Sequence, residues 1–152
     1  MNANANVPAG PYQRVLIAVD LSADSETVVR GGLRQCAAQT QPTLLHVCEY
    51  LPIDPTTDGL VAGAMLPPGE LLAAAERRLQ ALAGSLSLPA TVCEVRMGSP
   101  RAEIIAAAGE HRAELIVLGQ HERRGLQALF DATEDGVLHR APCDVLAVHV
   151  PA

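Results

Sequence analysis

The sequence predicts a single α/β domain built on a doubly wound, five-stranded parallel sheet with helices on both faces. Short apolar runs rich in Val, Ile and Leu alternate with segments whose apolar residues recur at helical spacing, in the order β-α-β-α-β-α-β-α-β. The 152 residues fit one domain, and the hydrophobic share of 49% supports a sizeable core. Right-handed crossovers leave 3-2-1-4-5 as the natural strand order.

Five apolar runs supply the expected strands. Each run is short, which favours a buried strand over a helix. The third run alternates in part between apolar and polar residues, so we expect it near an edge of the sheet. The expected strands cover residues 14–20, 43–50, 90–97, 113–119 and 143–150.

Four segments between these runs carry helical periodicity. Ser22 or Asp24 can cap the first helix, while Gly31 and Gly32 lower the helical propensity of its middle. Pro100 suits the first turn of the third helix. The expected helices cover residues 21–39, 69–86, 101–112 and 126–139.

The remaining segments set the boundaries of the domain. Residues 1–11 are small and polar and predict a flexible tail, so the domain covers residues 12–152. Prolines and glycines make residues 51–68 an irregular loop. The N-terminal segment lacks the basic start and apolar run of a signal peptide, and no window of about 20 apolar residues could span a membrane. We therefore expect a cytoplasmic protein.

Charge and cysteine spacing disfavour two further classes of protein. The net charge is −6, all basic residues are Arg, and none of their runs could follow a nucleic acid backbone, so we expect no nucleic acid partner. Cys36, Cys48, Cys93 and Cys143 form no C-x-x-C pair, which favours reduced, mostly buried thiols. Histidines in H-x-H or H-E-x-x-H spacing do not occur, so we expect no catalytic metal.

The topology places any ligand at the carboxyl ends of the strands, where the winding direction switches. This crevice would lie between the first and fourth strands, flanked by residues 19–22 and 119–124. Asp20 ends the first strand, and its carboxylate can either accept N–H bonds from the following turn or contact a ligand. Ser22 suits a helix cap better than a nucleophile. Because these residues form no recognised nucleophile–base pair, we expect no enzyme activity.

Four stretches of the chain resemble the universal stress protein family: "VLIAVDLSADS", "GSP", "ELIVLGQHERRGL" and "VLHRAPCDVLAVHV". The resemblance runs from about residue 12 to residue 151. It implies a Rossmann-like fold and a dimeric cytoplasmic stress protein without a well-defined catalytic reaction. One class of the family binds ATP through the motif G-x2-G-x8/9-G-S/T after the fourth strand, and there the Asp matching Asp20 contacts the adenosine part. The other class, similar to universal stress protein A, lacks this loop.

Compared with that motif, the chain keeps the first glycine as Gly119 and has Glu122 in place of the second. With eight intervening residues, which keeps "VLHRAPC" in register, the last two positions are Asp131 and Ala132. With nine, they are Ala132 and Thr133. A carboxylate about 4 Å from a phosphate costs roughly 4 kcal/mol at an effective dielectric of about 20. We therefore expect the class that does not bind ATP, and no cofactor.

The alternative is an ATP-binding stress regulator with a modified phosphate loop. Arg123 and Arg124 could reach a phosphate, or a divalent cation could bridge Glu122 or Asp131 to it. The same stretch also fits a solvated turn in which Glu122 pairs with a neighbouring arginine. If a nucleotide binds, the expected contacts are Asp20, Ser22, Gly119, His121, Arg123, Arg124 and Thr133.

The last strand is a candidate dimer seam. It is apolar, terminal and at the edge of the predicted sheet, where unpaired backbone groups invite a second copy. The expected function is therefore that of a non-catalytic homodimeric stress protein that acts through protein partners not identified by the sequence. The expected dimer strand consists of Val145, Leu146, Ala147, Val148, His149 and Val150.

Overall fold

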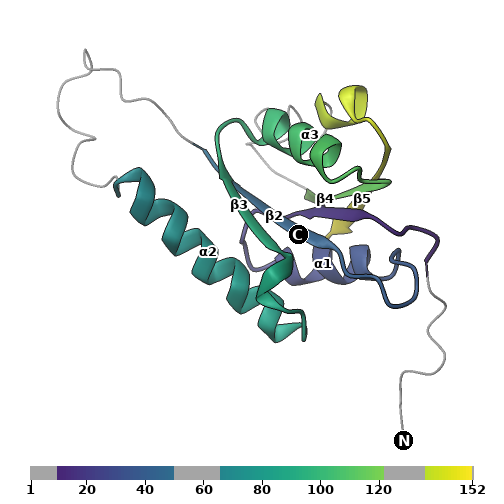
Figure 1. Ribbon diagram of the computed structural model, residues 1–152, viewed down its shortest axis with the longest axis horizontal. Helices are drawn as coiled ribbons and strands as arrows, with labels where there is room; N and C mark the ends of the chain where they lie inside the picture. Colours follow the sequence, from purple (N-terminus) through teal and green to yellow (C-terminus); the bar gives the residue numbers. More distant parts are fainter. Residues whose placement is uncertain (1–9, 50–65, 122–135, 152) are drawn as a thin grey trace, which may run out of the picture.

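The computed structural model contains a five-stranded parallel sheet in the order β3-β2-β1-β4-β5, which confirms the predicted order. The structure describes residues 10–49, 66–121 and 136–151. In Figure 1 the purple strand β1 runs through the middle of the sheet. The strands are β1 (Val15–Ala18), β2 (Thr43–Cys48), β3 (Cys93–Met97), β4 (Leu115–His121) and β5 (Asp144–Val150).

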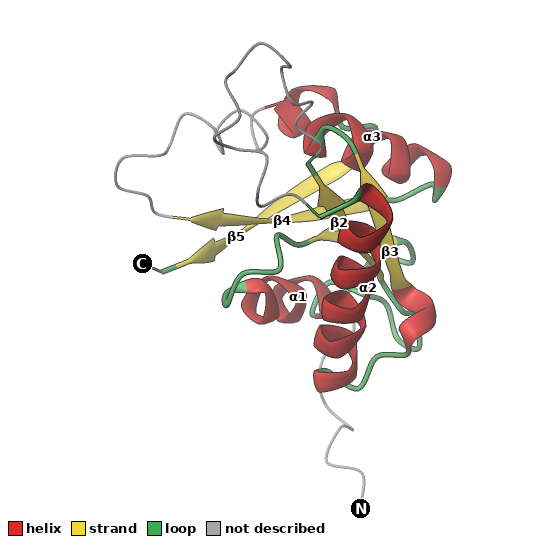
Figure 2. Cartoon of the chain, turned by 90° about the vertical axis from the view of Figure 1, so that its left-hand side faces the viewer, coloured by secondary structure: helices red, strands yellow, loops and turns green. Residues whose placement is uncertain are grey.

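Helices cover both faces of the sheet, as predicted. Helices α1 (Ser25–Leu33) and α2 (Pro68–Ser85) lie on one face, and α3 (Pro100–Glu110) lies on the other (Figure 2). Residues 136–140 are also helical and pack on the α3 face through Val137. They are the end of the fourth expected helix, whose earlier part lies outside the described residues.

Alternation along the central strands explains the two cores. Leu16 of β1 and Ile116 of β4 pack with α3, whereas Ile17 and Val117 pack with α1 and α2. Successive side chains of a strand point to opposite faces, so a strand covered on both faces must be apolar at every position. This requirement produces the continuous apolar runs from which the strands were predicted.

Gly31 and Gly32 let α1 lie directly on the sheet. A Cβ atom on Gly31 would lie 2.6 Å from Cγ2 of Val148, and one on Gly32 would lie 2.4 Å from Cδ1 of Ile17. Both glycines are buried within a continuous helix. The sequence predicted a weak middle for this helix, but the close contact with β1 and β5 accounts for the glycines.

The first helix is shorter than the predicted 21–39. It begins only at Ser25, because Leu21 adopts a left-handed conformation with φ of 60°. It ends at Leu33, and Cys36 then forms an isolated parallel bridge with Tyr12. The residues after Leu33 therefore pair with the segment that precedes β1 instead of continuing the helix.

The third strand is also shorter than the predicted 90–97. Residues Ala90–Val92 form a 3₁₀ turn, η1, and the strand proper begins at Cys93. All of its residues are half-buried, and it pairs only with β2 at one edge of the sheet, which confirms the predicted edge position.

Within the described part of the chain, no helix is both long and apolar enough to cross a bilayer.

Candidate functional site

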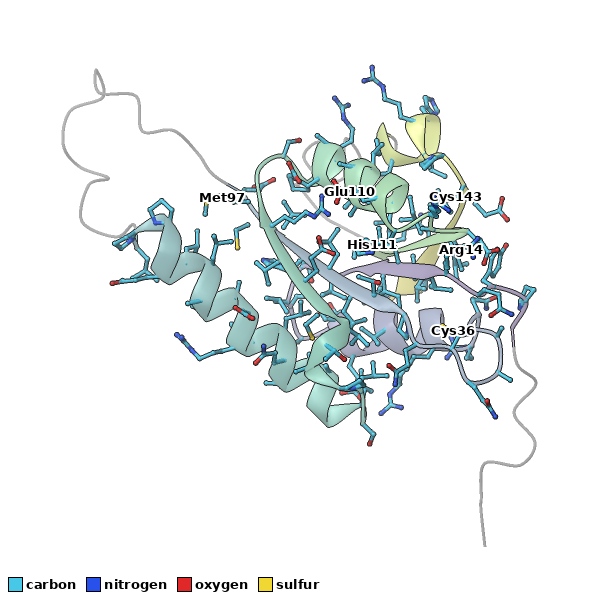
Figure 3. The ribbon with its side chains drawn as sticks, in the orientation of Figure 1. Arg14, Cys36, Met97, Glu110, His111 and Cys143 are labelled. Atoms are coloured by element: carbon cyan, nitrogen blue, oxygen red, sulfur yellow. The ribbon has the colours of Figure 1, made fainter. Side chains whose placement is uncertain are left out.

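A crevice of about 530 Å³ opens at the carboxyl ends of β1, β2 and β4. Its floor includes Val19 and Leu118, and one wall is a stripe of α2. Pro100 and Ile104 of α3 line it from the other face of the sheet. Met97, labelled in Figure 3, marks the end of β3 at the same edge of the sheet. The crevice therefore lies at the switch point where the topology predicted a ligand site.

The structure brings two of the predicted site residues together at this crevice. Asp20 and Gly119 both line it. Ser22 is not among the described lining residues. The side chain of His121 lies outside the described part of the chain. So do Glu122, Arg123, Arg124, Asp131, Ala132 and Thr133.

Asp20 organises the turn between β1 and α1. Its Oδ1 accepts hydrogen bonds from the Ser22 N–H, at 2.9 Å, and from the Ser25 hydroxyl, at 3.2 Å. Ser25 is buried, so this bond satisfies a polar group that water reaches poorly. The local role predicted for Asp20 is confirmed, and its place in the crevice wall keeps the ligand role open.

The start of α1 differs from the prediction that Ser22 or Asp24 caps the helix. Asp24 occupies the N-cap position of α1, but its side chain makes no capping hydrogen bond. Ser22 Oγ instead accepts the N–H of Asp24 at 3.3 Å, one step before the helix. Asp24 has an αR conformation, whereas a capping side chain usually extends from a β-region residue. The hydroxyl of Ser22 therefore shapes the turn and does not cap α1.

Arg78 of α2 holds this turn from the opposite side. Its Nη2 donates to the carbonyl oxygen of Leu21 at 2.7 Å. A left-handed conformation costs a residue such as Leu21 roughly 1–2 kcal/mol. The bond from Arg78 and the burial of the Leu21 side chain help to offset that cost.

His46 of β2 ties down the end of β1. Its Nδ1 lies 2.8 Å from the carbonyl oxygen of Val19. Because a carbonyl oxygen only accepts, this contact assigns the hydrogen to Nδ1, which leaves Nε2 of the neutral ring as an acceptor. The Val19 N–H in turn donates to the carbonyl of Leu45 at 2.9 Å. The chain leaving β1 is thus fixed by β2 as well as by α2.

Sequence reasoning missed His46 and Arg78 as crevice residues. The signal for Arg78 was present, since Leu71, Ala74, Ala75 and Arg78 follow helical spacing and form one stripe of α2. The sequence did not show that this stripe of α2 faces the crevice.

The thiol of Cys48 also lines the crevice. Burial raises the pKa of the Cys48 thiol, which keeps it protonated at neutral pH and poorly reactive. Within the described ranges, no three His, Cys, Asp or Glu side chains gather in a way that could hold a metal ion. The crevice combines apolar lining residues from the sheet, α2 and α3 with the polar side chains of Asp20, His46, Glu49 and Arg78.

Together, the sheet order and the crevice define a doubly wound, Rossmann-like α/β protein with a crevice at the switch point. The chain belongs to the universal stress protein family, whose model matches residues 11–149. This finding confirms the resemblance to that family noted in the sequence.

Relatives and solved structures agree with this assignment. The chain is 30% identical over 141 residues to universal stress protein A homolog 2 of Coxiella burnetii, covering 91% of this chain and 96% of that protein. A crystal structure of a universal stress protein in complex with cAMP is 25% identical, has a TM-score of 0.57, and covers 91% and 97% of the two chains. The structure of hypothetical protein MJ0577 is similar in fold, with a TM-score of 0.68, 19% identity, and coverage of 91% and 96%.

Proposed function

We propose that this universal stress protein is a non-catalytic, cytoplasmic stress-response protein that acts as a homodimer and does not hold ATP through the segment after β4. The main support for a non-catalytic function is the set of side chains at the switch-point crevice. The ionisable residues that line its described part are Asp20, His46, Cys48, Glu49 and Arg78, and three of these side chains, those of Asp20, His46 and Arg78, hold the backbone at the end of β1 and in the turn that follows. They form no nucleophile–base pair of the kind that acyl or phosphoryl transfer needs.

The phosphate part of the proposal rests on the sequence after Gly119. Glu122 replaces a glycine of the ATP-binding motif, and Asp131 replaces another under the preferred spacing. A cost of roughly 4 kcal/mol for one carboxylate beside a phosphate corresponds to about a thousandfold loss in affinity. That loss would move an ordinary micromolar ATP site to about a millimolar.

The homodimer part of the proposal rests on β5. This strand ends the sheet, so one row of its backbone groups has no neighbouring strand in the sheet. Ala147 and His149 are exposed on the face of the sheet that α3 partly covers. A second copy placed along this edge would cover both the backbone and these side chains.

Calorimetric titration of the full-length protein with ATP, with and without Mg²⁺, tests the proposal. We expect no binding up to about a millimolar, where the free energy is only about −4 kcal/mol. Tight binding only with Mg²⁺ would mean that Glu122 or Asp131 recruits a cation. Tight binding without metal would mean that the arginines of the loop dominate, and either result would overturn the proposal.

A second candidate function is the binding of a compact adenine nucleotide with one phosphate. Two observations favour it: the volume of about 530 Å³ is typical of small-molecule sites, and a similar universal stress protein forms a complex with cAMP. A single phosphate would meet less repulsion from the loop carboxylates than a triphosphate. Titration with AMP and cAMP tests this candidate, and binding of either at concentrations where ATP does not bind would support it.

A further inference from the structure

Arg78 is the permanently charged cation among the described residues that line the crevice. It belongs to the α2 stripe that also carries Leu71, Ala74 and Ala75, so this wall changes from apolar to cationic along its length. A small ligand lying on the apolar part would bring a polar end close to Arg78.

The guanidinium of Arg78 is held in place before any ligand arrives. Its Nη2 donates to the Leu21 carbonyl at 2.7 Å, and that oxygen is fixed in turn by the left-handed turn after β1. A carbonyl is neutral, so this bond does not itself neutralise the positive charge of Arg78. The planar group has further N–H donors and, once one edge is fixed, presents the others in a defined direction.

Arg78 is the charge that favours an anion on the α2 side, since the other charged residues of the described lining, Asp20 and Glu49, are acidic and follow β1 and β2. Sequence places Glu122 in the segment after β4, where ATP-binding relatives have glycine, whereas α2 offers an arginine. A charge-assisted hydrogen bond to guanidinium is roughly twice as strong as a neutral one. An anionic group therefore gains binding free energy where it contacts Arg78 on the α2 side of the crevice.

We propose that Arg78 is a specificity-determining residue that binds the phosphate of a compact adenine nucleotide, so that the phosphate lies toward α2 and not toward Gly119 near the end of β4. The proposal rests on the second candidate function, since it requires a mononucleotide in the crevice. It assigns the anion contact to a helix that the ATP motif does not include.

The test compares AMP with adenosine, which lacks the phosphate, by calorimetry on full-length protein. The wild type is expected to bind AMP about tenfold or more tightly than adenosine. Arg78→Gln is expected to remove that difference while adenosine affinity stays within about threefold. Arg78→Lys keeps the charge and is expected to retain part of the difference in affinity between AMP and adenosine. Arg77→Gln is the matched control, because Arg77 is exposed on the same helix outside the crevice lining.

The outcomes separate this proposal from the function on which it rests. If Arg78→Gln weakens AMP and adenosine equally, Arg78 acts only through the Leu21 turn, and the assignment fails. If wild type binds AMP and Arg78→Gln binds it equally well, the assignment again fails, but the nucleotide function stands. If wild type binds neither probe up to about a millimolar, the second candidate function fails and the Arg78 proposal fails with it.

Discussion

Arg96, on the edge strand β3, draws carboxylates from two elements together. Its guanidinium pairs with Glu94 of the same strand at 2.6 Å, and with Glu103 and Glu110 of α3. His111, at the end of α3, lies 2.6 Å from the other oxygen of Glu94. Glu110 and His111 are labelled at the end of α3 in Figure 3. This network is the polar contact that fastens α3 to the edge of the sheet.

The Arg96→Met variant tests the strength of this network. Arg96 is only 16% exposed, so its removal leaves the partly buried Glu94 without its cation, which is expected to cost roughly 2 kcal/mol. Arg30→Met is the matched control, because the Arg30–Glu26 pair is 58% and 50% exposed and contributes about 0.5 kcal/mol or less. Urea unfolding measures both. Equal effects of the two substitutions would contradict the role given to Arg96.

The same network predicts how stability depends on pH. Burial raises the pKa of Glu94, but hydrogen bonds from His111 and Arg96 outweigh burial, and the net pKa is lowered. A hydrogen bond from Arg96 likewise lowers the pKa of Glu110. A carboxyl whose pKa is lower in the folded state stabilises the fold above its unfolded pKa, and this contribution is lost as the pH falls through the folded value.

We therefore expect little contribution of these carboxyls to pH dependence between pH 7 and about 5, and a decline in unfolding free energy below about pH 5. In Arg96→Met the two pKa values return toward the ordinary range, so the decline becomes shallower. Urea titrations at several pH values between about 3 and 7 measure both slopes. A decline of the same steepness in wild type and Arg96→Met would contradict this account.

Substitution of Glu122 tests the proposal that the segment after β4 does not hold ATP. Glu122→Gly restores a motif glycine and removes a charge, so we expect ATP affinity to rise by roughly a hundredfold or more. Glu122→Gln removes only the charge and separates electrostatics from backbone freedom. Calorimetry with ATP measures both variants. If neither variant binds ATP more tightly than wild type, repulsion by Glu122 is not what keeps ATP out.

At the scale of elements, strands were easier to predict than the boundaries and faces of helices. Leu16 and Ile17 are buried on opposite faces, and that requirement is visible in sequence as an unbroken apolar run. The left-handed Leu21 is different, because its conformation depends on Arg78, more than 50 residues away. Asp20 and Gly119 were found because topology alone places strand ends together, whereas the orientation of Arg78 depends on how α2 packs.

The glycines of α1 give a prediction at this scale. Alanine normally favours a helix over glycine by about 1 kcal/mol. In Gly32→Ala, however, the new Cβ would lie 2.4 Å from Ile17 Cδ1, so overpacking is expected to destabilise the protein by about 1–3 kcal/mol. Gly84→Ala in α2 is the control, since nothing lies within 4 Å of its Cβ position, and it should be neutral or stabilising. Thermal unfolding distinguishes the two, and a stabilised Gly32→Ala would show that α1 can shift freely.

For the whole molecule, the two edges of the sheet differ in how they are covered. At β3, α2 packs along the strand and the Arg96 network ties it to α3. At β5, Leu146 and Val148 face the core shared with α1, and the Tyr12 hydroxyl donates to Asp144 at 2.8 Å. In the described part of the chain, the opposite face of β5 leaves Ala147 and His149 exposed. This asymmetry is the physical basis for placing a second copy at β5.

Ala147→Asp tests the proposed dimer. Ala147 is exposed in the monomer, so an aspartate there should change monomer stability by only about 0.5 kcal/mol. In a dimer joined along β5, each copy would bring the new charge to an apolar seam, and desolvation together with like-charge repulsion is expected to dissociate it.

Sedimentation at micromolar concentration is expected to give a dimer for wild type and a monomer for Ala147→Asp. Ala81→Asp is the matched control, because Ala81 is exposed on α2, which packs against β2 and β3 far from β5 in the sheet order. It should remain dimeric. If the wild type sediments as a monomer, the homodimer part of the proposed function is wrong. If both variants remain dimeric, the dimer interface does not include the exposed face of β5, since burying a carboxylate there would be costly.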